Sequence, residues 1–182
     1  MSARPVRANG DGLQRLRALL DEQGGLMATL LAPSPDTNGG GHACAHESPA
    51  ALAAKGPRAQ GRREEYELLV EAIYEGYLLH YDSPRLLHVP EADLRLLAGD
   101  QLYAIGLARL VGLGDTMAVA ELADTITLSA LANGAGRRPL ADVIWQAGAR
   151  AVGWGSSEPH TQAKALAFAG RWEAIEAMRT SV

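Results

Sequence analysis

His42, Cys44 and His46 are the residues whose types most directly suggest chemistry, because imidazole and thiolate groups suit zinc or copper. They alternate with alanines in a glycine-rich segment, and Glu47 follows them. Structural zinc sites usually take four ligands, with pairs set on turns. The spacing therefore favours a flexible linker that happens to contain these residues, and a metal-responsive module is the alternative.

Asp100 is the second candidate, because it is a carboxylate within a leucine-rich stretch. If it is buried, it must be paired, hydrogen-bonded or protonated, since an isolated buried charge is very costly. Gly99 lowers helix propensity by roughly 1 kcal/mol relative to Ala, and its expected benefit is close approach of a neighbouring helix. The favoured interpretation is a structural Asp that bonds this neighbour. The alternative is an acid or base that acts with Asp82 and His80 in a bundle cavity.

Four aromatic residues are candidates for an interface or a channel wall, because aromatic side chains anchor interfaces: Tyr74, Tyr77, Tyr103 and Trp145. Two of them belong to a tyrosine stripe beside the apolar side of a predicted helix. Packing at the edge of the core is the favoured role for this stripe, since Tyr buries its ring and keeps its hydroxyl near water.

The segment 94–111 must position Asp100, and its composition predicts one long helix. Its apolar residues point nearly all round the helix, which is typical of a helix buried in the middle of a bundle. Its charged residues make it too polar for a membrane span.

A second helix is predicted over residues 62–81, and the proline at position 84 ends it. We expect its acidic residues to form a solvated side. These residues are Glu64, Glu67, Glu71, Glu75 and Asp82.

The remaining helices give an all-α fold, a bundle of about six helices with no convincing strand. We expect disorder over 1–10 and a flexible linker over 32–61, where turn residues are frequent. The bundle domain is expected over 62–182. The helix before the linker is predicted over 11–31, with a break at Gly24-Gly25. The bundle domain is predicted to contain three further helices: one from the N-cap Asp115 to 132, one that begins at Pro139, and one over 159–178.

Composition narrows the possible functions. The 182 residues are 47% hydrophobic, enough for one domain with a core, and the net charge of −4 offers no basic stripe for nucleic acid. Cys44 is alone, so there is no disulfide framework. No secretory signal or membrane span is evident, and the cytoplasm is the default compartment. No phosphate loop, dinucleotide fingerprint or serine elbow is present.

Two adjacent stretches resemble the trans-polyprenyl diphosphate synthases. The stretch 73–82 resembles the family's helix that ends in Leu-Ile-His before an aspartate-rich motif. Leu96-Leu-Ala-Gly99-Asp100-Gln-Leu-Tyr-Ala104, followed by Leu113-Gly114-Asp115, resembles the next helix, which reads Leu-Ala-Gly-Asp-Tyr-Leu and ends at Leu-Gly-Asp. The likeness covers about residues 66–130, roughly a third of the chain.

The chain departs from the catalytic members of that family. They hold magnesium with two Asp-Asp-x-x-Asp motifs, because several carboxylates are needed to bind the cations that neutralise diphosphate. Here the first motif would fall at 81–85, where only Asp82 remains, and no second motif follows. The chain therefore looks like the small subunit of two-component heptaprenyl diphosphate synthases, which lacks these motifs.

That resemblance implies a non-catalytic, regulatory subunit that associates with a catalytic prenyltransferase subunit or with itself. It needs no cofactor of its own, since magnesium would belong to the catalytic partner. Two alternatives remain open. One is a small helical enzyme or binding protein for an isoprenoid or another apolar ligand, and the other is the metal-responsive module.

Overall fold

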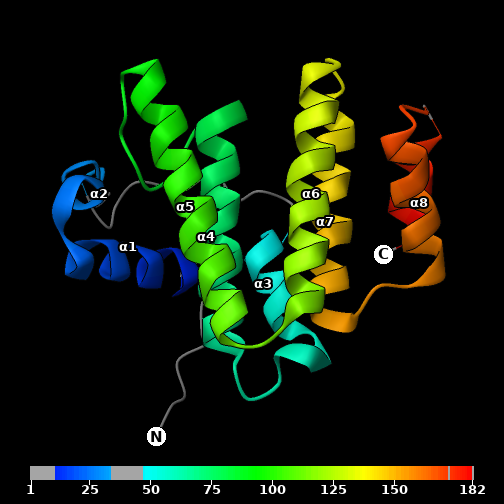
Figure 1. Cartoon of the computed structure of the whole chain (residues 1–182), viewed down its shortest axis with the longest axis horizontal. Coiled ribbons are helices and arrows are strands. Elements are labelled where there is room, and N and C mark those ends of the chain that lie inside the picture. Colours follow the sequence, from blue (N-terminus) through cyan, green and yellow to red (C-terminus); the bar gives the residue numbers. More distant parts are fainter. Residues whose placement is uncertain (1–10, 34–46, 172, 182) are drawn as a thin grey trace, which may run out of the picture.

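The computed structural model describes residues 11–33, 47–171 and 173–181 (Figure 1), which form helices and no sheet. The predicted all-α class is confirmed, although the described residues hold nine α-helices rather than about six. None of these helices combines the length and the hydropathy of a membrane span. The helices are α1 (Asp11–Gln23), α2 (Gly25–Thr29), α3 (Pro49–Lys55), α4 (Arg63–Tyr81), α5 (Ala92–Gly112), α6 (Thr116–Gly134), α7 (Arg138–Trp154), α8 (Glu158–Phe168) and α9 (Ala174–Thr180), with a 3₁₀ turn, Pro57–Ala59, after α3.

The helices form two arms joined by α3. Helix α5 packs on α4 in one arm, α6 packs on α7 in the other, and α3 contacts both α4 and α7. A short loop joins α5 to α6 at one end of the molecule, and their ribbons separate toward the other end (Figure 1). Helices α1 and α2 lie beside the first arm, and α8 lies beside the second.

Glycines allow the helices within each arm to approach closely. A Cβ on Gly76 would lie 2.9 Å from the carbonyl oxygen of Gly99, and a Cβ on Gly99 would lie 3.1 Å from the carbonyl oxygen of Gly76. A Cβ on Gly106 would likewise lie too close to the side chain of Ile73 and to the backbone of α4. In the other arm, Gly148 of α7 faces the side chain of Thr125 on α6. The close approach expected at Gly99 is confirmed, and a larger residue at any of these positions would have to displace a facing side chain or the facing backbone.

Helix α4, and not α5, is the helix covered on nearly every side, so the prediction of a buried central helix over 94–111 was wrong. The buried residues of α5 form one stripe against α4, whereas Leu97 and Val111 are 66% and 63% exposed. A helix that is apolar all round can be enclosed by neighbours or can leave one apolar side uncovered. The sequence pattern is the same in both cases, which explains the error.

Part of the expected linker over 32–61 is a core helix. The Oγ atom of Ser48 accepts a hydrogen bond from the backbone N–H of Ala51 and caps α3. The alanines of α3 are mostly buried between the arms, and Gly56 packs directly against Gly153 of α7. Turn residues on both sides of this short alanine-rich helix hid it in the sequence. Residues 1–10 and 34–46 lie outside the described residues, so the expectations about them stay untested.

Two predicted helices are divided. Gly24 and Gly25 both have positive φ, 68° and 69°, and they separate α1 from α2 as expected. The helix predicted over 159–178 is instead α8 and α9, with Gly170 at a φ of 66° between them. That glycine was not recognised as a stop, and it lets α9 fold back against α7 and α8.

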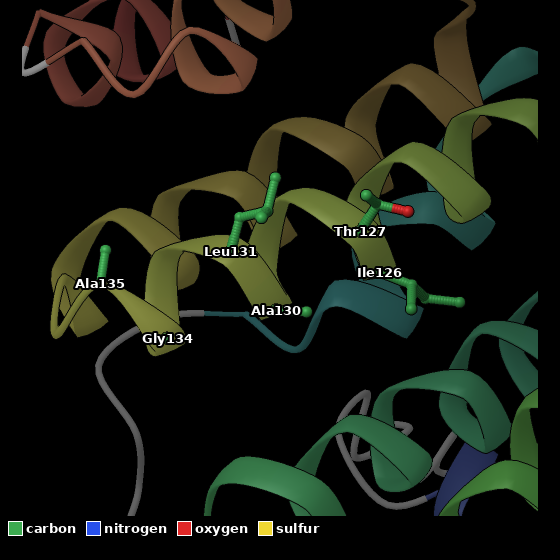
Figure 2. A pocket seen from close by; sticks show the side chains of 6 residues that line it. All are labelled: Ile126, Thr127, Ala130, Leu131, Gly134 and Ala135. Carbon is green, nitrogen blue, oxygen red and sulfur yellow. The ribbon is translucent and has the colours of Figure 1, made fainter.

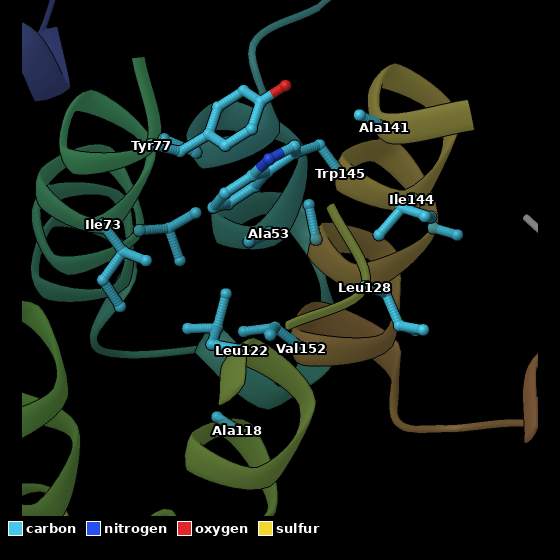
Figure 3. Close-up of a cluster of buried hydrophobic side chains, with 14 of the residues drawn as sticks. Ala53, Ile73, Tyr77, Ala118, Leu122, Leu128, Ala141, Ile144, Trp145 and Val152 are labelled. Atoms are coloured by element: carbon cyan, nitrogen blue, oxygen red, sulfur yellow. The ribbon is translucent and has the colours of Figure 1, made fainter. Parts of the chain in front are cut away.

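The main core lies between the two arms. Trp145 of α7 lies beside Tyr77 of α4, with Ile73 and Leu122 below them (Figure 3). A second apolar cluster joins α1 to the outer side of the first arm, and Leu16 and Leu20 are fully buried there. Apolar burial on both sides of α4 makes this helix the centre of the fold.

Candidate functional site

The metal candidates His42, Cys44 and His46 lie in the segment 34–46, outside the described residues. Among the residues that the structure places, no three His, Cys, Asp or Glu side chains come close enough together to hold an ion. The hypothesis of a metal-responsive loop therefore stays a prediction.

The structure pairs two of the three candidate catalytic residues with each other. The Nε2 atom of His80 lies 3.2 Å from Oδ1 of Asp100, an ion-pair distance, but the directional geometry of a hydrogen bond is lacking. Asp82 instead pairs with Arg138 of α7. Asp100 is also not a buried carboxylate, because 69% of its side chain is exposed. The geometry thus brings His80 and Asp100 together and leaves Asp82 in a separate ion pair.

The predicted aromatic residues do cluster, but mostly in the interior. Ring centroids of Tyr74 and Tyr77 lie 5.0 Å and 5.1 Å from that of Trp145. Tyr77 is 3% exposed and Trp145 is 1% exposed, so neither offers its ring to a partner at the surface. Burial raises the pKa of Tyr74 to about 12. These three residues contribute to packing between the arms, and a channel-wall role for them stays a prediction.

Tyr103 extends this cluster to α5. Its ring stacks on His80 with centroids 5.3 Å apart and planes only 2° from parallel. The Tyr103 hydroxyl is buried without a hydrogen-bond partner, while the Tyr77 hydroxyl accepts one from Nδ2 of Asn133 at 3.2 Å. Tyr81, which is 39% exposed, lies between His80 and Tyr77, with ring centroids 5.8 Å and 5.5 Å away, so the aromatic cluster connects both arms.

An exposed surface that is rich in apolar side chains lies on α5 and α6. Figure 1 shows α5 in front of α4 and α6 in front of α7, so the sides turned away from these neighbours lie on the same side of the molecule. We call this surface the α5–α6 face. Its exposed residues are almost all apolar or small: Leu96, Leu97, Ala104, Ala108 and Val111 on α5, and Met117, Ala120, Ala123, Thr127 and Leu131 on α6.

A shallow concavity lies on the α6 part of this face (Figure 2). Thr127 and Leu131 point to one side of the helix and Ile126 to the other, with the small residues Ala130 and Gly134 between them. Small side chains allow another helix to approach closely. The shape and the apolar composition suit a helical protein segment better than a polar small molecule.

Two buried ionic networks were missed from the sequence. Glu71 and Glu75 are 3% and 0% exposed, so the prediction that they face solvent was wrong. Both pair with Arg85, and Oε1 of Glu75 also accepts the backbone N–H groups of Arg85 and Leu86 at 2.6 Å. Burial raises the pKa of Glu71, and Arg85 offsets part of that shift. Periodicity could not reveal this network, because its cation comes from a loop.

The second network joins α6 to α8. Nε2 of His160 lies 3.1 Å from Oε2 of Glu121, and Nζ of Lys164 lies 3.0 Å from Oε1. Burial would raise the pKa of Glu121, but the hydrogen bonds from His160 and Lys164 outweigh it and lower this pKa to about 2. His160 and Glu121 are both nearly inaccessible, so the arrangement can hold α8 in place but cannot meet a substrate.

Comparison with known proteins found no match to this chain among protein-family models, curated proteins or solved structures.

Proposed function

We propose that this protein is a non-catalytic helical subunit that works by docking a larger helical partner on the α5–α6 face. The observation that carries the proposal is the apolar composition of this face. Four large apolar side chains of this face are each more than half exposed: Leu97, Val111, Met117 and Leu131. Exposed apolar side chains gathered on one side of a soluble protein often mark an interaction site.

The spacing of the exposed residues supports helix-on-helix docking. Leu97, Gln101, Ala104, Ala108 and Val111 follow one another at alternating intervals of four and three residues, and all of them are exposed. This spacing places one continuous stripe along a helix that can meet a partner helix lengthwise. The alanines in the middle of the stripe allow close contact, and the larger side chains at its ends supply apolar area.

The resemblance to two-component synthases suggests the class of partner, the catalytic subunit of a trans-polyprenyl diphosphate synthase. The residues of α5 that carry the resemblance lie on two different sides of the helix. Ala98 and Gly99 are buried at the crossing with α4, while Asp100 lies at the edge of the α5–α6 face. In the proposed role, the first pair holds the arm together and the outward side meets the catalytic subunit.

The test is co-purification with the catalytic trans-polyprenyl diphosphate synthase subunit encoded in the same genome, followed by its product analysis. Ala108→Glu places a charge in the middle of the stripe and should abolish co-purification. Ala18→Glu is the matched control, because Ala18 is an exposed alanine of α1 that lies away from the face. Both substitutions leave the buried residues intact.

The expected result is a complex with the unaltered chain and with Ala18→Glu, accompanied by a change in the activity or product length of the catalytic subunit. No complex would contradict the proposed partner. A complex that Ala108→Glu leaves intact would contradict the proposed face.

A further inference from the structure

The charges on the α5–α6 face indicate what kind of helix it accepts. None of the exposed residues of α5 or α6 is Lys or Arg, whereas Asp93 and Asp100 are exposed on α5. The basic residues of α5 are turned away, since Arg109 pairs with Glu65 of α4 at 2.9 Å and Arg95 donates to the backbone oxygen of Asp82. The face is therefore apolar along its length and acidic in its first half.

We infer that the partner contributes an amphipathic helix with an apolar stripe and Lys or Arg beside that stripe. This inference rests on the proposed function and names the chemistry of the contact. Asp100 lies one turn from Leu97 and Ala104, so a cation beside the apolar stripe of the incoming helix can reach its carboxylate. Complementary charges of this type fix the direction of the incoming helix and exclude acidic competitors.

The same charges disfavour a second copy of this chain as the occupant. A symmetric pair would bring the same face from both copies, and that face supplies no cation. In such a pair Asp100 would gain no Lys or Arg from the other copy and would keep only His80 of its own chain, 3.2 Å away, as a partner. A heterologous basic helix satisfies both the apolar stripe and the acids.

The experiment titrates the full chain with two synthetic helical peptides of about three heptads, following coiled-coil spacing. Both carry the same Leu/Ala stripe, and they differ only in having Lys or Glu at the flanking positions. The Lys peptide should bind about tenfold more tightly at low salt, a preference that should shrink as added salt screens the charges.

Neutralising substitutions test whether the named acids cause the preference. Asp93→Asn combined with Asp100→Asn should reduce the preference to about twofold or less, since both acid contacts are lost. The control, Asp21→Asn with Glu22→Gln, removes two exposed acids from the end of α1 and should keep the preference. The control equals the test variant in net charge.

Equal affinity for the two peptides, no binding of either, or a preference that depends on Asp21 and Glu22 would overturn the inference. The proposed function can fail separately. If the catalytic subunit binds and Ala108→Glu disrupts the complex while the peptides show no charge preference, only the partner chemistry is wrong. If the catalytic subunit does not bind while the peptide preference depends on Asp93 and Asp100, the partner class is wrong and the charge inference holds.

Discussion

Gly106→Ala should destabilise the protein although alanine is the better helix former. An added Cβ would lie 2.8 Å from the carbonyl oxygen of Leu69 and 2.9 Å from Cδ1 of Ile73, with Cγ1 of Ile73 closer still. The carbonyl belongs to the α4 backbone and cannot rotate away, so the two helices must separate. Overpacking at such a site costs about 3 kcal/mol at the upper end of its usual range. The helix-propensity gain of about 1 kcal/mol offsets part of this cost. The expected net loss is about 2 kcal/mol.

Gly112→Ala is the matched control on the same helix. No atom lies within 4 Å of a Cβ at this position, so the substitution should be neutral or should stabilise by up to about 1 kcal/mol. Urea unfolding followed by far-UV circular dichroism measures both variants, and thermal unfolding should show a decrease of about 4–8 °C for Gly106→Ala. If Gly106→Ala is as stable as Gly112→Ala, the close contact between α4 and α5 does not exist as described.

Two further predictions concern the buried ionic networks. The pKa of Glu121 is lowered to about 2 from an ordinary 4.5, so its ionised form stabilises the folded state fully above pH 4.5. That stabilisation, roughly 3 kcal/mol, should be lost as the pH falls from about 4.5 through about 2. In urea unfolding across this range, the stability difference between the unaltered chain and Glu121→Gln should shrink with falling pH, and a constant difference would contradict this account. Arg85→Met leaves Glu71 and Glu75 buried without their guanidinium group and should cost about 3 kcal/mol. Adding Glu71→Gln should restore part of that loss in the same assay, and an Arg85→Met variant of unchanged stability would refute the role of the pair.

Local structure followed from the sequence where single residues decide it. The break at Gly24-Gly25 is confirmed. Asp115 does cap α6, because its Oδ1 accepts the backbone N–H of Ala118 at 3.0 Å. Pro84 does end α4 before the following loop. The need for a close neighbour at Gly99 was also predictable, since glycine within a helix otherwise lowers stability.

The rest depends on contacts between distant parts of the chain. The burial of Glu75 requires Arg85, which lies in a loop that periodicity does not describe. The exposed side of α5 looks the same in sequence as a buried one, because both consist of leucine, alanine and valine. The candidate site could therefore be predicted only as a set of residues. In the structure the aromatic members of that set lie mostly in the interior, and Asp82 pairs with Arg138 apart from His80 and Asp100. The apolar residues of the outward face were not in the predicted set.

The most direct test of the docking account is site-specific photo-crosslinking in the presence of the catalytic synthase subunit. A photoreactive residue at Ala108 reports contacts of the α5–α6 face, and the same residue at Ala18 reports contacts of α1. We predict a crosslink to the catalytic subunit from position 108 and none from position 18. A crosslink from position 18 alone, or none from position 108 in a verified complex, would contradict the account.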